Sequence, residues 1–199
     1  MTRRTAALAL FASPIAALAQ KKDDKPGFRP AKASTFENAQ KGSGLVLAAA
    51  TYTSDAEASQ AFGKVNPYEY GVLPVLFLIE NNGKQTIRLE GIQVQYISAD
   101  RQKAESIPPN EVRFLRAPKR PKMPGTDPLP IPRRKAKNPL EAFEIEARAF
   151  TAKMLPAGES AHGFFYFQAI HKPGAKLYVT GLREAATNND LFYFEIPLS

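Results

Sequence analysis

The chain has no cysteine and no tryptophan, and it has only two histidines and three methionines. The absence of cysteine excludes disulfide frameworks, zinc–thiolate sites, covalent haem attachment and thiol nucleophiles. The sequence also lacks a Gly-x-Ser-x-Gly motif, a His-Glu-x-x-His motif and a glycine-rich phosphate loop. Most of the usual catalytic chemistry is therefore missing, and we expect a protein that is not an enzyme and that uses no cofactor.

What is present is the composition of an ordinary globular protein, with 199 residues of which 44% are hydrophobic and 23% charged. This length and balance predict one compact domain. Lysine and arginine number 27 against 19 aspartates and glutamates, which gives a net charge of +8, and there are 17 prolines. The basic excess and the prolines are unevenly distributed, and their position guides the functional hypothesis below.

Residues 1–19 have the three parts of an export signal. Two arginines near the start precede a short apolar run at residues 6–12, and residues 17–19 form the Ala-Leu-Ala site that a signal peptidase accepts. The run is far shorter than the roughly 18–20 apolar residues that cross a bilayer. We expect cleavage after Ala19 and a soluble, periplasmic or extracellular protein without a transmembrane segment. The arginine pair leaves general and twin-arginine export both open.

The mature chain divides into a leader and a folded domain. Residues 20–43 begin with lysines and aspartates and contain little to bury except Phe28 and Phe36, so we expect a flexible leader. Residues 44–199 are expected to form one domain. Its first strand is predicted over residues 44–52, where the sequence is apolar and bounded by turn residues.

Two local patterns after this strand are specific. Ser54 and Glu57 have the spacing of a capping box and predict a helix over residues 55–62. Residues 72–80 are almost continuously branched or aromatic and predict a strand buried on both faces. The Asn-Asn-Gly-Lys turn that follows predicts a hairpin between this strand and residues 85–89.

The later elements are short. Alternating apolar residues predict strands over residues 92–97, 150–154, 163–168, 175–180 and 191–198. Asn138 and Pro139 predict a short helix to residue 147, although Phe143, Ile145 and Ala147 also alternate as a strand would. About seven short strands separated by turns predict an all-β, antiparallel β-sandwich with one or two short helices.

Residues 71–82 (GVLPVLFLIENN), residues 155–167 (LPAGESAHGFFYF) and a terminal strand ending at Leu198 carry a family resemblance. An early strand that leads to Glu-Asn and a turn, and a Leu-x-x-Gly-Glu turn that leads into an aromatic strand, resemble the immunoglobulin-like sandwiches of small uncharacterised exported bacterial proteins. The resemblance covers roughly residues 45–198 apart from one insertion. It implies an immunoglobulin-like fold, and it implies no catalytic residues.

The insertion spans about residues 99–138, and it is basic and rich in proline. Residues 101–137 contain eleven basic and three acidic residues, and residues 108–139 contain nine prolines. We expect either a basic arm that binds polyanions or a solvated, semi-rigid excursion. The candidate polyanion-binding residues are Arg116, Lys119, Arg120, Lys122, Arg133, Arg134, Lys135 and Lys137.

Two weaker features remain. His162 and His171 flank the predicted aromatic strand and, with Met154, are weak candidates for a metal site, although their spacing matches no metal motif. The predicted strands also place several aromatic side chains in sets. Phe165, Phe167 or Tyr193 would form an exposed strip that binds a partner or sugar, unless the insertion covers them.

Together these patterns predict a non-enzymatic, exported interaction or structural module of the bacterial cell envelope. Its partner is expected to be an envelope protein or an anionic polymer. Specific nucleic acid binding is not expected, because Phe114 is the only aromatic residue within the basic stretch. The alternatives are a polyanion-binding protein that acts through the insertion and a metal- or ligand-carrying periplasmic protein.

Overall fold

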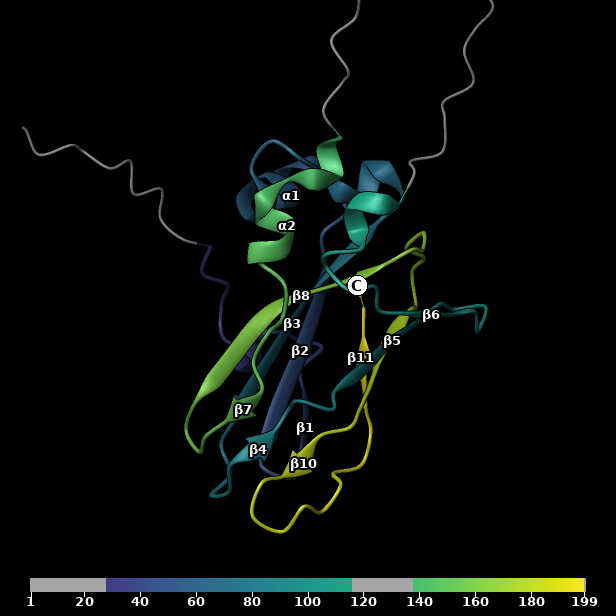
Figure 1. Cartoon of the computed structure of the whole chain (residues 1–199). Coiled ribbons are helices and arrows are strands. Elements are labelled where there is room, and N and C mark those ends of the chain that lie inside the picture. The colour runs from purple at the N-terminus through teal and green to yellow at the C-terminus, as the bar shows by residue number, and fades with distance from the viewer. Residues whose placement is uncertain (1–27, 116–137, 199) are drawn as a thin grey trace, which may run out of the picture.

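The computed structural model describes residues 28–115 and 138–198 (Figure 1). The strands in these residues are β1 (Gln40–Gly42), β2 (Leu45–Thr51), β3 (Leu73–Asn81), β4 (Ile87–Arg88), β5 (Gln93–Ile97), β6 (Lys103–Glu105), β7 (Met154–Leu155), β8 (Ser160–Phe167), β9 (Lys176–Thr180), β10 (Arg183–Glu184) and β11 (Phe194–Pro197). The helices are α1 (Asp55–Phe62) and α2 (Phe143–Ala147), with 3-10 turns η1 (Ala33–Thr35), η2 (Pro67–Tyr70), η3 (Val112–Phe114) and η4 (Pro139–Glu141). None of the described helices is long and apolar enough to span a membrane.

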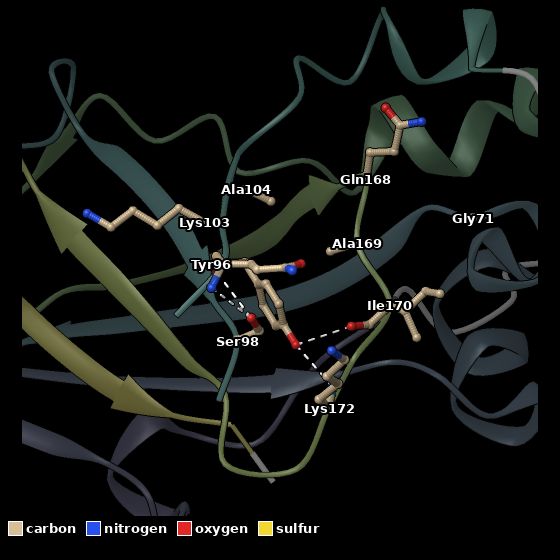
Figure 2. Close-up of a pocket in the computed structure, with 10 residues that line it drawn as sticks. Gly71, Tyr96, Ser98, Lys103, Ala104, Gln168, Ala169, Ile170 and Lys172 are labelled. Atoms are coloured by element: carbon tan, nitrogen blue, oxygen red, sulfur yellow. Dashed lines mark hydrogen bonds between the residues drawn. The ribbon is translucent and has the colours of Figure 1, made fainter. Parts of the chain in front are cut away.

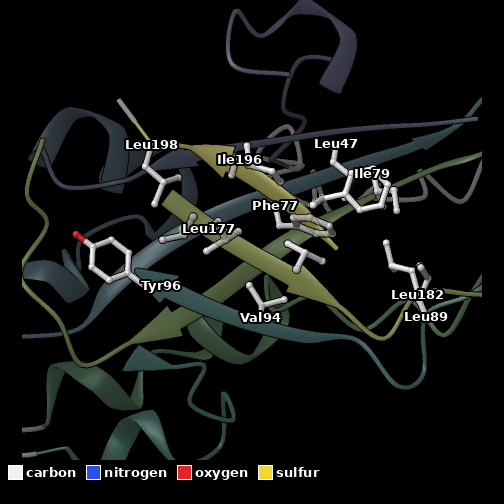
Figure 3. Close-up of a cluster of buried hydrophobic side chains, with 14 of the residues drawn as sticks. Leu47, Phe77, Ile79, Leu89, Val94, Tyr96, Leu177, Leu182, Ile196 and Leu198 are labelled. Atoms are coloured by element: carbon white, nitrogen blue, oxygen red, sulfur yellow. The ribbon is translucent and has the colours of Figure 1, made fainter. Parts of the chain in front are cut away.

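The strands form a sandwich of antiparallel sheets. One four-stranded sheet has the order β1-β2-β3-β8 and the other β11-β9-β5-β6, while the short strands β10-β4-β7 close one end. The main hydrophobic core lies between them and takes Phe77 from the first sheet, Leu177 from the second and Leu89 from beside the third (Figure 3). The predicted all-β sandwich is therefore confirmed.

Strand β3 organises both sides of its sheet. It pairs with β2 along one edge and with β8 along the other. Its side chains alternate between the main core, where Phe77 lies, and a second buried cluster, where Leu76 and Leu78 lie. The prediction of a strand buried on both faces is confirmed, and its almost continuous apolar sequence follows from the two clusters.

The second cluster lies on the outer face of this sheet and extends to a group of short helices at one end of the sandwich, α1, α2, η3 and η4, which we call the helical layer (Figure 1). Phe164 of β8 is at its centre, with ring centroids 5.5 Å from Phe28, 4.9 Å from Tyr52 and 4.7 Å from Phe62. Phe167 instead lies in the main core between the sheets, and the partly buried Phe165 packs against that core. They therefore do not form the exposed strip that the strand pattern allowed. Tyr193 alone of the three is exposed, at 58%.

Helix α1 has the predicted bounds and the predicted start. The Ser54 hydroxyl accepts a hydrogen bond from the Glu57 main-chain N–H at 3.3 Å, and the Glu57 carboxylate accepts one from the Ser54 N–H at 3.1 Å. This capping box satisfies two N–H groups that the first turn would leave unpaired. The predicted helix start is therefore confirmed. The sequence could predict it because a capping box depends only on two residues that are three positions apart.

The predicted hairpin is wrong. Both edges of β3 are taken by β2 and β8, and β4 instead pairs with β10 and β7 in another sheet. The side-chain amide of Asn81 donates to the oxygens of Gln85 at 2.8 Å and Leu155 at 3.0 Å. These bonds stabilise the turn while the chain crosses from one sheet to the next.

The predicted flexible leader is corrected over its described part. Strand β1 pairs with β2, and Phe28 and Phe36 pack against the second cluster. The side-chain amide of Asn38 donates to the oxygens of Ala49 at 2.7 Å and Pro197 at 2.6 Å, which links this segment to both sheets. Residues 20–27 and the predicted signal, residues 1–19, lie outside the described residues.

The segment after the insertion is helical, as predicted. The Asn138 side chain accepts a hydrogen bond from the Leu140 N–H at 3.1 Å and begins η4, which leads into α2. The alternative of a strand over Phe143, Ile145 and Ala147 is wrong, because these residues form α2. Ile145 is buried in the second cluster while Phe143 is exposed, whereas a strand would place both side chains on the same face.

The start of the insertion is folded. Strand β6 pairs with β5, and Ile107 forms a bridge to Tyr166 of β8. Val112 is fully buried in the second cluster. The predicted excursion is thus corrected up to residue 115, and residues 116–137 lie outside the described part of the chain.

Candidate functional site

A groove of about 550 Å³ opens between the β6 side of one sheet and residues 168–172, which follow β8 of the other (Figure 2). This volume is in the range of protein ligand sites. Its lining residues are Gly71, Tyr96, Ser98, Gln102, Lys103, Ala104, Gln168, Ala169, Ile170 and Lys172.

Two tyrosine hydroxyls hold the 168–172 wall against the sandwich. The Tyr96 hydroxyl accepts a hydrogen bond from the Lys172 N–H at 3.1 Å, and the Tyr68 hydroxyl accepts one from the His171 N–H at 3.1 Å. The Tyr96 ring is buried, and this burial raises the pKa of its hydroxyl above the ordinary value. The wall is fixed by main-chain hydrogen bonds that do not depend on its side chains.

An ion pair closes one end of this wall. The Lys172 ammonium lies 2.8 Å from the Asp100 carboxylate, which also accepts a hydrogen bond from the Ser98 hydroxyl. The bond from Lys172, followed by that from Ser98, lowers the pKa of Asp100 to about 2. The same contact raises the pKa of Lys172. Both side chains are about half exposed, so this pair is screened by solvent and contributes little to stability.

The groove offers the chemistry of a binding site. Tyr96, Ala104 and Ala169 supply apolar surface, while Gln102 and Gln168 supply amide donors and acceptors. The lining also includes Lys103 and Ala104 of β6, which is the edge strand of its sheet. These groups can bury an apolar group and pair with polar ones, which is how small binding sites are generally built.

The structure does not bring the three metal candidates together. His162 lies within β8 with its ring 6.5 Å from Phe28, and His171 lies beyond the strand with its ring 6.3 Å from Tyr96. Burial lowers the pKa of both histidines. Met154 is in β7, which belongs to a third sheet. In the described ranges, no group of three or more histidine, aspartate or glutamate side chains is placed to hold a metal.

The eight polyanion-binding candidates, from Arg116 to Lys137, all lie outside the described residues. The described ends on either side of them meet at the helical layer, where Asn138 bonds to Arg113. Charge is divided sharply between the two parts of the sequence. The described residues contain 14 basic and 16 acidic residues, whereas residues 116–137 contain eight basic and one acidic.

The groove was missed from the sequence because main chain and small side chains form much of it. The available signal was Tyr96, an inward-facing tyrosine near the end of an alternating strand. A buried tyrosine hydroxyl needs a hydrogen-bond partner, which indicates that another segment crosses that end of the sandwich.

No protein-family model and no curated protein matches the chain. Among solved structures, the yjhA protein from Bacillus subtilis is 11% identical with a TM-score of 0.42, covering 81% of this chain and 96% of that one. The secreted protein MPT63 from Mycobacterium tuberculosis is 12% identical with a TM-score of 0.31, covering 79% of this chain and 89% of that one. We draw no functional conclusion from similarities of this degree.

Proposed function

We propose that the protein is a non-enzymatic, exported interaction module of the bacterial cell envelope, built on an immunoglobulin-like sandwich. The division of charge is the observation that supports this proposal. A domain with a slight acidic excess carries a 22-residue segment, 116–137, with eight basic residues and one acidic residue. A structural role in the sandwich gives no reason for such a concentration of one sign, whereas attraction to an anionic partner does.

An anionic polymer is the partner that this charge fits best. The two described ends of the segment are held together by the hydrogen bond between Asn138 and Arg113. The eight basic residues therefore all belong to one stretch of sequence whose two described ends lie close together. Binding that depends on such charges weakens steeply as salt is added, because salt screens the attraction and competes for the polymer.

Retention of the purified mature chain on phosphocellulose at low salt tests the partner. The arm variant replaces Lys119, Arg120, Lys122, Arg133, Arg134 and Lys135 with serine or glutamine. The matched control removes the same charge from exposed positions of the sandwich: Lys32, Lys41, Lys64, Lys84, Lys153 and Arg183. We expect the arm variant to elute unretained and the control to elute at nearly the salt concentration of the wild type.

Equal losses in both variants would show that only net charge matters, and full retention of the arm variant would exclude the segment as the binding site. Both variants should keep the wild-type melting temperature, since exposed charges contribute little to stability.

Export is tested separately. The basic start, the short apolar run and the Ala-Leu-Ala site of residues 1–19 predict cleavage after Ala19. Protein recovered from the envelope or the medium of the producing cell should therefore begin at Gln20. N-terminal sequencing measures this directly. Recovery of mature material that still contains residues 1–19 would contradict the proposal.

A further inference from the structure

We propose that the groove beside β6 is a strand-addition site, which binds an extended polypeptide segment of a partner protein antiparallel to β6. The residues of this site do not include the basic segment, and the site gives the proposed interaction module a second, sequence-selective contact.

The first support is the unpaired edge of β6. Strand β6 is the last strand of its sheet, and it pairs only with β5 among the described residues. Hydrogen bonds from Ser98 N–H to the Gln102 oxygen at 2.9 Å and from Ser106 N–H to the Val94 oxygen at 3.2 Å show which residues face β5. Since direction alternates along a strand, the main-chain groups of Lys103 and Glu105 face the other way.

The second support is a ladder that begins beside the groove and stops. The Ile107 N–H donates to the Tyr166 oxygen at 2.7 Å, in an antiparallel bridge between the two sheets. Continuing that bridge would pair residues 105 and 103 with residues 168 and 170. Instead the groove separates these two segments, and both line it. In the part of the chain that the structure describes, the edge of β6 at Lys103 and Ala104 thus borders an open space of about 550 Å³ and not another strand.

The third support is the direction of the side chains. The Lys103 side chain points away from the groove, so this residue lines it with main chain (Figure 2). Tyr96 and Ala104 are opposite each other on β5 and β6 and share the inward face. A further strand would continue this row, and its residue opposite Ala104 would enter the groove toward Ile170.

This register defines the chemistry of the segment that fits. The residue opposite Ala104 should be apolar, because it is placed over Tyr96 and Ala169. Its two neighbours lie on the outer face, beside Glu105 and Lys103. An antiparallel segment meets Glu105 first, so the order from N- to C-terminus is basic, apolar, acidic, which gives favourable cross-strand charge pairs on both sides.

A phage-displayed library of random octapeptides tests this proposal. The bait is the arm variant described above, so that acidic peptides are not enriched by the basic segment. We expect enriched peptides to contain the basic–apolar–acidic order, and synthetic copies to bind with an affinity measurable by fluorescence anisotropy.

Two substitutions at one residue separate main-chain from side-chain recognition. Lys103→Pro removes the N–H that faces the groove but leaves the hydrogen bonds between β6 and β5 in place. It should therefore lower the affinity for the enriched peptides at least tenfold. Lys103→Ala keeps that N–H and should bind within about threefold of the bait. Ala104→Met, which fills the groove from its floor, should also weaken binding tenfold and serves if the proline variant does not fold.

Equal binding to the bait and to both the proline and methionine variants would overturn the proposal, as would a library that yields no enrichment over selection against Ala104→Met. An equal loss of peptide binding in Lys103→Ala and Lys103→Pro would also overturn the proposal. That result would mean that the Lys103 ammonium, and not the main chain of β6, recognises the peptide. None of these outcomes depends on the phosphocellulose result, so the two proposals fail independently.

Discussion

The side-chain amide of Asn138 donates a hydrogen bond to the main-chain oxygen of Arg113, 2.6 Å away. The same side chain accepts a hydrogen bond from the Leu140 N–H at 3.1 Å and so caps η4. One asparagine therefore begins the helical layer after residues 116–137 and ties it to η3, the turn before them. The elements on the two sides of residues 116–137 are therefore held together by a single side chain.

Replacing Asn138 with alanine removes both bonds. We expect Asn138→Ala to lower the free energy of unfolding by about 1 kcal/mol, the usual effect of losing an N-cap, and by more if the Arg113 oxygen finds no water. Urea denaturation measures the change. Asn189→Ala, in an exposed loop, is the control and should remain within about 0.5 kcal/mol of the wild type. A variant indistinguishable from that control would show that the tie has no effect on stability.

A second prediction concerns the bond that anchors α2 to the sheet. The buried Tyr166 hydroxyl donates to the Ile145 oxygen at 2.6 Å, and burial raises the pKa of this hydroxyl above its ordinary value. Tyr166→Phe leaves the carbonyl buried without its donor, which should cost about 1–3 kcal/mol in urea unfolding. The exposed Tyr193→Phe is the matched control and should be nearly neutral. If both substitutions are neutral, α2 does not depend on this anchor.

The elements that were predicted correctly depend on neighbouring residues. The capping box of α1 involves residues close together in the sequence. The apolar run of β3 predicts burial on both faces, and this prediction does not depend on which strands lie beside it. The Asn-Asn-Gly-Lys turn is also predicted from neighbouring residues. Turn residues, however, do not indicate which strand the next segment pairs with. The hairpin prediction failed at that point, because β2 and β8 occupy both edges of β3.

Features that depend on distant residues were not predictable. Residues 28–43 have few apolar side chains, yet Asn38 ties them to oxygens of two separate sheets. The groove likewise arises where β6 and residues 168–172 diverge, and its edge is main chain, which leaves no mark in side-chain composition. The two histidines were grouped because they flank one predicted strand, but the fold places them in different environments.

A third prediction uses two glycines that face each other. Gly181 has φ of +78°, and a Cβ on it would lie 2.0 Å from the Gly91 main-chain oxygen. A Cβ on Gly91 would meet the Gly181 oxygen at 3.6 Å, an ordinary contact. Gly181→Ala should therefore destabilise the domain by more than about 1 kcal/mol, whereas Gly91→Ala should be tolerated. Thermal melts of the two variants measure this difference, and equal melting temperatures would contradict the close approach.

The last prediction concerns the ion pair beside the groove. The folded state lowers the pKa of Asp100 from 3.8 to about 2, chiefly through the hydrogen bond from Lys172. A carboxyl group with a lowered pKa stabilises the fold above its unfolded pKa, and that contribution disappears as the pH falls through the folded pKa. The contact between Asp100 and the 168–172 wall should accordingly persist at pH 4 and be lost near pH 2.

Carboxyl ¹³C NMR titration follows Asp100 directly. In the wild type its midpoint should lie near pH 2, and Lys172→Met should move it toward 3.8, with the Ser98 hydroxyl retaining part of the shift. Lys176→Met is the matched control, because that lysine pairs with Glu195 at 2.7 Å on another strand pair and should leave the Asp100 midpoint unchanged. A wild-type midpoint at 3.8 or above would mean that the lysine does not hold this carboxylate in solution. The groove wall would then be held by the Tyr68 and Tyr96 hydroxyls without a contribution from this ion pair.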